Sequence, residues 1–294
     1  MFFQNLNGQT RAFFCALLGF SSFAIGDAAY KWLADVAPPM VNGMIGAGLA
    51  VVLVLLYGAF KGEFLSFWTI PKRKLHLLRG VLIAAQFLLF LYAYSHLPLT
   101  TAYAVIFCAP FLTVLLAPLL IKEPFHKAEG IAALIGFAGV LLAFPPNPDG
   151  LELTAFLAAL GSAVFVALIN ILANFIGPQE RNGYAFAVYA IGITFFIALG
   201  LVLANGDPLP DITPKLGFAY LLAGASGIGG VVMVAIAFTK AKTGFIASTH
   251  YVQIFWGVVL GYLLFGDIPS LQVIAGISLI VGSGIYLLRY GIKP

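Results

Sequence analysis

Residues 80–121 read GVLIAAQFLLFLYAYSHLPLTTAYAVIFCAPFLTVLLAPLLI, a run of 42 residues without aspartate, glutamate, lysine or arginine. A helix that crosses a lipid bilayer needs about 20 mostly apolar residues. The run is therefore long enough for two crossings, and Ser95-His96-Leu97-Pro98 near its middle predicts a corner between them. Helices are favoured because membrane-spanning strands are about 10 residues long and alternate polar with apolar side chains.

The rest of the chain has the same character. Hydrophobic residues make up 62% of its 294 positions, charged residues make up 9%, and the mean hydropathy is +1.03. A soluble domain carries roughly 25% charged residues, so most of this surface must face lipid. We predict an all-α integral membrane protein with ten transmembrane helices and no soluble domain. The expected spans are 11–33, 38–60, 77–96, 99–121, 127–145, 152–176, 183–204, 216–239, 244–266 and 270–290.

The distribution of positive charge predicts the orientation. If both termini are cytoplasmic, 13 of the 15 lysines and arginines lie on the cytoplasmic side and only Lys31 and Lys215 lie outside. This accounts for the net charge of +4 without a nucleic-acid partner. The first apolar stretch, residues 12–25, continues into Asp27 and Lys31 without a cleavage motif, so we expect a retained helix in a multi-pass inner or plasma membrane protein.

An internal repeat divides the chain. A shift of 144 residues aligns residues 76–123 with residues 220–267 without a gap, and the acids Glu123 and Asp267 fall in register. We predict two five-helix repeats, residues 1–146 and 147–294. Because five is odd, the second repeat enters the membrane from the opposite side, and such inverted repeats form a midplane site that opens alternately to either side. The pattern therefore favours a transporter.

Two stretches carry a family resemblance. Residues 97–124, LPLTTAYAVIFCAPFLTVLLAPLLIKEP, resemble the third-to-fourth helix block of EamA-type transporters in the drug/metabolite transporter superfamily, and residues 26–33, GDAAYKWL, are similar to a first-helix pattern in many members. The second half departs from the pattern, with Ile254 at the counterpart of Pro110 and Asp267 in place of glutamate. The resemblance implies transport of amino acids, nucleoside- or cofactor-like metabolites, or amphipathic drugs.

Polar side chains inside apolar helices are the candidate substrate contacts, because they are costly at membrane depth. Asp27 and Lys31 stand one turn apart, with Tyr30 between them. Two interpretations remain open for this pair. The residues form a static ion pair at the end of their helix, or one of them contacts a charged substrate group or takes up a proton.

The other candidates fall on single faces of their helices. Arg79 is either an anchor at the cytoplasmic mouth or a gate, and Pro110 is expected to kink its helix. The remaining polar groups either hydrogen-bond between helices or line the cavity, and the aromatic ones either form its wall or pack in the core or against lipid. These candidate substrate-binding residues are Gln86, Phe90, Tyr103, Phe107, Asn170, Asn174, His250, Gln253 and Trp256.

Other site types find little support. The glycine-rich stretch 224–230 lacks the Lys-Ser/Thr ending of a phosphate-binding loop, so we interpret it as close helix packing or local unwinding, and Gly257-x-x-x-Gly261 as close packing within the bundle or across a dimer. Cys15 and Cys108 lie in apolar runs and predict neither a disulfide nor a metal site. No catalytic motif occurs, so we expect no enzyme, no cofactor and no metal; a channel or intramembrane enzyme is the minor alternative.

The predicted function is secondary active transport of a small amphipathic metabolite by alternating access. Aromatic side chains together with a few polar anchors favour an amino acid, aromatic ones especially. The alternative solute is cofactor-like, such as S-adenosylmethionine, riboflavin or a nucleoside-like compound. The expected partners are this solute, the lipid bilayer and a coupling proton or ion, with the chain a monomer or a homodimer.

Overall fold

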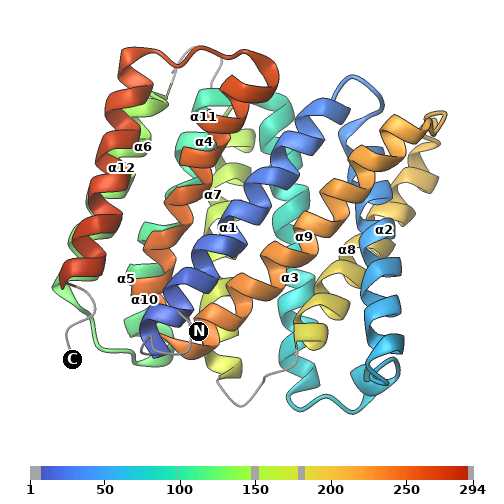
Figure 1. The fold of residues 1–294 in the computed structure, drawn as a ribbon, viewed down its shortest axis with the longest axis horizontal. Coiled ribbons are helices and arrows are strands. Elements are labelled where there is room, and N and C mark those ends of the chain that lie inside the picture. The colour runs from blue at the N-terminus through green and yellow to red at the C-terminus, as the bar shows by residue number, and fades with distance from the viewer. Residues whose placement is uncertain (1–7, 98, 147–151, 178–182, 291–294) are drawn as a thin grey trace.

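The structure, a computed structural model, describes residues 8–97, 99–146, 152–177 and 183–290. This part of the chain is a single bundle of helices and contains no strand (Figure 1). The predicted boundary between the two repeats falls between residues 146 and 147, and residue 147 lies outside these ranges. Pro98, which belongs to the predicted corner, also lies outside them. The helices are α1 (Gly8–Leu33), α2 (Pro39–Phe60), the short 3-10 helix η2 (Ser66–Trp68), α3 (Arg73–His96), α4 (Leu99–Ile106), α5 (Ala109–Ile121), α6 (Lys127–Ala143), α7 (Leu153–Ile176), α8 (Gly183–Asn205), α9 (Pro214–Lys240), α10 (Thr243–Ala247), the 3-10 helix η3 (Ser248–Tyr251), α11 (Val252–Phe265) and α12 (Leu271–Tyr290).

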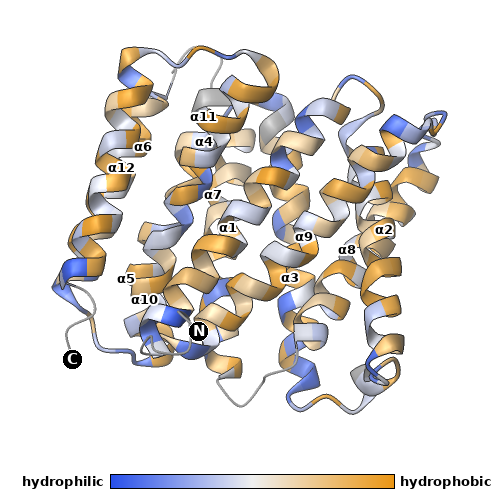
Figure 2. Cartoon of the chain, viewed as in Figure 1, coloured by the Kyte–Doolittle hydropathy of each residue, from blue (hydrophilic) through white to orange (hydrophobic). Residues whose placement is uncertain are grey.

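The predicted all-helical membrane fold is confirmed. Within the described residues, nine helical segments are long and apolar enough to cross a bilayer. The remaining predicted span, 127–145, is α6, which has 17 residues and packs along α12. Apolar residues cover the middle of the bundle, whereas hydrophilic residues gather toward its two ends (Figure 2). Large apolar side chains such as Phe60, Phe196 and Leu203 are exposed, as expected for a surface that faces lipid.

Corresponding helices of the two halves run in opposite directions. The start of α1 and the end of α7 lie at the same end of the bundle, where Gln9 and Ile176 line one cavity. The end of α5 and the start of α10 meet at that end too, where the backbone N–H of Thr243 donates to Glu123. The first helix of one half is therefore antiparallel to the first helix of the other, and the same holds for the two fourth helices, as inverted repeats require.

Two predicted spans are interrupted rather than continuous. The span expected at 99–121 breaks at Phe107 and Cys108, and the span expected at 244–266 passes through the 3-10 segment η3. Pro110 lies in the first turn of α5, where its missing N–H costs no helical hydrogen bond. The second break has no proline. Instead, the hydroxyls of Ser248 and Thr249 donate to the carbonyls of Gly244 and Ile246, and such bonds compete with regular helix geometry.

Glycines let the helices at the centre approach closely. A Cβ on Gly224 of α9 would lie 2.8 Å from the carbonyl oxygen of Gly46 and 3.2 Å from the backbone nitrogen of Ala50, both in α2. The packing interpretation of residues 224–230 is therefore confirmed, and α9 stays helical throughout. The same interpretation is wrong for Gly257 within the described bundle, because no atom lies within 4 Å of a Cβ built there.

Candidate functional site

Toward one end of the bundle, polar contacts join α1 to the first turn of α11 and to the segment that follows α11. Lys31 Nζ lies 2.5 Å from Asp267 Oδ2 and 4.3 Å from the centre of the Phe265 ring. One turn deeper, Gln253 Nε2 donates to Asp27 Oδ2 at 2.6 Å. The alternative in which Asp27 and Lys31 pair with each other is therefore wrong here. Both residues instead bind α11 or the segment that follows it, because α1 packs directly against α11.

Aromatic rings continue this contact toward the middle of the bundle. The His250 ring stacks on Phe20 of α1, with 4.4 Å between centroids and an interplanar angle of 16°. Phe107, at the break between α4 and α5, also contacts His250, with 5.4 Å between the ring centroids. The ring centroid of Tyr103 lies 6.0 Å from that of Phe107 and 5.9 Å from that of Phe144. The structure thus brings residues from the broken helices of both halves together against α1.

Two members of this aromatic cluster escaped the sequence analysis. Phe20 lies seven residues before Asp27 in α1, so the two share a helix face, and this spacing was a usable signal. Phe144 follows the last residue of α6 and carried no comparable signal. We refer to Phe20, Tyr103, Phe107, Phe144 and His250, with Asp27 and Gln253, as the central cluster.

Other predicted site residues lie apart from the central cluster. Gln86 of α3 donates to the Ser162 hydroxyl of α7 at 3.2 Å, and Phe90 packs where α3, α4 and α7 meet. Tyr30 packs with Leu33 and Tyr220 on the side of α1 that faces α9. Trp256 is 37% exposed and stacks edge-on against Phe255.

Asn170 and Asn174 of α7 separate from each other. Asn170 is buried, whereas Asn174 donates to the carbonyls of Phe238 at 2.9 Å and Ala241 at 3.2 Å and lines the cavity described below. Asn174 therefore bonds α7 to α9 and the residue after it, and the cavity that it lines is at one end of the bundle rather than at the midplane.

Arg79 does not sit at the mouth as an exposed anchor. It is 4% exposed, and its guanidinium lies 5.3 Å from the centre of the Phe186 ring of α8. His76, one turn earlier on α3, is buried against the same ring at 4.9 Å. The exposed positive charge at this end comes instead from Lys72, Arg73 and Lys74. The anchor interpretation of Arg79 is therefore wrong, because α8 covers this face of α3.

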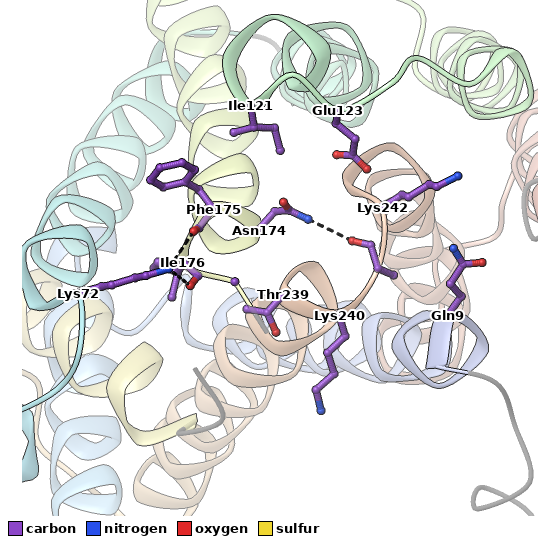
Figure 3. Close-up of a pocket in the computed structure, with 12 residues that line it drawn as sticks. Gln9, Lys72, Ile121, Glu123, Asn174, Phe175, Ile176, Thr239, Lys240 and Lys242 are labelled. Carbon is purple, nitrogen blue, oxygen red and sulfur yellow. Dashed lines mark hydrogen bonds between the residues drawn. The ribbon is translucent and has the colours of Figure 1, made fainter. Parts of the chain in front are cut away.

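A cavity of about 760 Å³ opens at the end of the bundle opposite the Lys31–Asp267 pair. Lys72 Nζ donates to the carbonyl of Ile176 at 2.5 Å and so caps the end of α7. Figure 3 shows Lys72, Glu123 and Asn174 around this space. Of its lining residues, sequence analysis proposed only Asn174 as a candidate site residue and used Glu123 only to mark the repeat, because the charged residues stand at loop edges, where charge predicts only topology. The lining residues are Gln9, Lys72, Ile121, Glu123, Asn174, Phe175, Ile176, Gly177, Thr239, Lys240, Ala241 and Lys242.

Metal and disulfide chemistry find no support in the described part of the chain. No group of three or more His, Cys, Asp or Glu side chains there could hold a metal ion, and both cysteines are free thiols.

Comparison with known proteins points to transport. A family model described as the EamA-like transporter family matches residues 10–144. A Helicobacter pylori protein named an uncharacterized transporter is 30% identical over 276 residues, which are 92% of each chain. A riboflavin transporter of Brucella anthropi is 26% identical over 73% of this chain and 76% of its own. The pseudopaline exporter CntI of Pseudomonas aeruginosa is 25% identical over 93% of this chain and 94% of its own.

The fold itself also has a solved counterpart. A crystal structure with 18% sequence identity superposes with a TM-score of 0.79 over 97% of this chain and 99% of that chain. At this identity the likeness concerns the fold alone.

Proposed function

Since this chain belongs to the EamA-like transporter family of the drug/metabolite transporter superfamily, we propose that it is a secondary active transporter of a small amphipathic metabolite. The observation that carries this proposal is the asymmetry of the two ends. Polar contacts between α1 and α11 close one end, and a cavity of about 760 Å³ opens the other. One site that opens to one side at a time is what alternating access needs.

The closing contacts join the two halves of the chain. Asp27 and Lys31 belong to the first half, and Gln253 and Asp267 to the second. Opening the closed end therefore requires these contacts to break while the contacts at the cavity end rearrange. Rocking of one half against the other does both in a single motion.

The open end is the cytoplasmic one in our proposal. Lys72, Lys240 and Lys242 line the cavity, whereas Lys31 is at the closed end. The positive-inside rule then puts both termini and the cavity mouth in the cytoplasm of an inner or plasma membrane. The Lys31–Asp267 pair becomes an external gate.

The central cluster supports a solute that joins a planar ring to a polar group. Rings of Phe20, Phe107 and His250 supply aromatic surface, and the carboxylate of Asp27, bound to Gln253 three residues after His250, suits an ammonium or a hydroxyl donor. An aromatic amino acid has both features and is our first candidate. Riboflavin has a planar ring and hydroxyl groups and is the alternative, favoured by the relatives that carry that name.

Exchange in proteoliposomes tests the proposal. Vesicles loaded with unlabelled tryptophan or riboflavin should accumulate the same labelled solute, with saturation and acceleration by solute on the far side. Asp27→Asn should reduce this exchange at least tenfold, because the change removes the charge that orients the solute. Asp211→Asn is the matched control, since Asp211 is exposed in the loop between α8 and α9. If the wild type exchanges either solute and Asp27→Asn exchanges it at the same rate, the proposed role of Asp27 is wrong. Conduction of the solute without trans-acceleration would indicate a channel.

A further inference from the structure

A second polar cluster joins the two halves at the cavity end, where the segment between α5 and α6 meets the start of α10. Glu129 in the first turn of α6 is 4% exposed, and its Oε1 atom has no hydrogen-bond partner. Thr243 at the start of α10 is 0% exposed, and its hydroxyl oxygen has no partner either. Two buried polar groups are thus left unsatisfied at one junction, which is costly unless something binds there.

The backbone of α10 lies directly against the Glu129 carboxylate. A Cβ on Gly244 would collide with Oε2 of Glu129 and displace the carboxylate from its present position. Beside the carboxylate is a cavity of about 10 Å³, lined by Glu123, Glu129, Gly244 and neighbouring apolar residues. A space of this size holds about one water molecule.

The charges at this junction do not balance. Glu123 and Glu129 are two acids, and Lys242 is the basic group beside them, with its Nζ 2.8 Å from His126 Nε2. The other charged groups on the elements around this junction are exposed, namely Lys122 after α5, Lys127 at the start of α6, Lys240 at the end of α9, Arg11 of α1 and Arg289 of α12. One more positive charge on the acids would neutralise the buried junction.

We propose that Glu129 binds a proton in this conformation and releases it when α10 moves away from α6. A proton fits better than a sodium ion. Both oxygens of Glu123 already accept the backbone N–H of Thr243, at 2.8 and 3.1 Å, so few oxygens are left to surround a metal ion, whereas a proton needs only Oε1 of Glu129. Neutral Glu129 is compatible with burial against Gly244, and ionised Glu129 requires water.

This proposal takes from the proposed function only the relative motion of the two halves. It assigns the coupling or gating proton to a residue outside the substrate site. Acid should therefore favour the conformation described here. Alkali should favour one in which the α6–α10 junction opens to water.

Distances between spin labels test this without a transport assay. Cys15 and Cys108 are replaced by alanine, and labels are placed at Leu120 of α5 and Lys240 of α9, both of which are exposed. Distance distributions are measured in lipid nanodiscs by double electron–electron resonance. We expect the parent to shift between two populations from about pH 5 to about pH 8, because a buried carboxylic acid titrates above its usual acid range.

Three variants identify the titrating group. Glu129→Gln, which cannot ionise, should keep the acid distribution at every pH. Glu123→Gln and His126→Gln should keep the shift, because each leaves Glu129 in place. A parent that shows no shift, or Glu129→Gln that shifts as the parent does, would overturn the proposal. So would a shift driven at constant pH by sodium in place of potassium.

Folding of the variants is checked by gel filtration. If Glu129→Gln is not monodisperse, Glu129→Asp decides, because the shorter side chain still titrates but withdraws from Gly244. A displaced midpoint supports the proposal and an unchanged midpoint overturns it. Failure of solute exchange with an intact pH shift would count against the proposed function alone.

Discussion

The ion pair between Lys31 and Asp267 sets how often the proposed external gate opens. Its atoms lie 2.5 Å apart, and the two side chains are 52% and 58% exposed. An exposed pair of this kind is worth about 0.2–1 kcal/mol. Asp267→Asn removes the charge and keeps the shape of the side chain. We therefore expect the equilibrium population with an open external end to rise by at most about fivefold, since 1.4 kcal/mol corresponds to tenfold.

Asp267 is a better target than Lys31. The Lys31 ammonium also lies over the Phe265 ring, so changing Lys31 would remove a cation–π contact as well as the ion pair. The double variant Lys31→Asp, Asp267→Lys reverses the pair and should bring back part of the closed population. Because the pair is exposed, high salt should move the wild type toward Asp267→Asn and leave that variant almost unchanged.

Spin labels at Ala34 and Ile268 report on this end, because both residues are exposed and flank the pair. The measurement uses nanodiscs with and without high salt, and the long-distance fraction gives the open population. An open fraction that is the same in wild type and Asp267→Asn would refute the gate. So would a salt response that survives in Asp267→Asn, because it would show that other charges hold this end closed.

Three further predictions concern stability. Gly224→Ala should lower the free energy of unfolding by about 1–3 kcal/mol, because its Cβ meets backbone atoms of α2, whereas Gly227→Ala, with no atom within 4 Å, should be neutral or stabilising in thermal denaturation. Asn42→Leu should lower the free energy of unfolding more than Tyr220→Phe does in the same assay, because Asn42 donates to two carbonyls and accepts from the Tyr220 hydroxyl at 2.6 Å. Tyr220→Phe loses only that last hydrogen bond, which is worth about 1 kcal/mol. Lys72→Met should accelerate amide hydrogen exchange in the last turn of α7, because the ammonium group caps that helix end.

Span positions were predictable from sequence because the bilayer constrains length and charge so tightly. The predicted span 11–33 corresponds to α1 at Gly8–Leu33, and 153–176 of the sixth predicted span is α7. Helix interruption was not predictable to the same degree. Pro110 indicated a break, but Ser248 and Thr249 are ordinary residues in a transmembrane helix, and their bonds to the preceding carbonyls depend on local packing.

The candidate site was predictable only in part. Depth in an apolar helix singled out Asp27 and Gln253, which hydrogen-bond to each other, but it could not say which helix supplies the partner of each. Lys31 shows the difficulty, because its neighbour in sequence is Asp27 and its partner in space is 236 residues away. Glu129 was missed altogether, since a glutamate two residues after a lysine at a helix start suggests a solvated end rather than a buried junction.

The two helix breaks are themselves evidence for how the halves work together. Phe107 at the first break and Tyr251 at the second are 144 residues apart, which is the offset of the internal repeat. Pro110 follows the first break, and the hydroxyls of Ser248 and Thr249 lie at the second. A shared sequence motif therefore does not explain why both breaks occur at the same repeat position. A shared geometric need does. Each break lies where the fourth helix of its half passes the central cluster, with Phe107 on one side of His250 and Tyr251 next to it in the chain. An uninterrupted helix would have to move as one rod from membrane face to membrane face. A broken one can bend beside the central cluster as one half rocks against the other, so in the proposed transport cycle the break helps one end to open while the other closes.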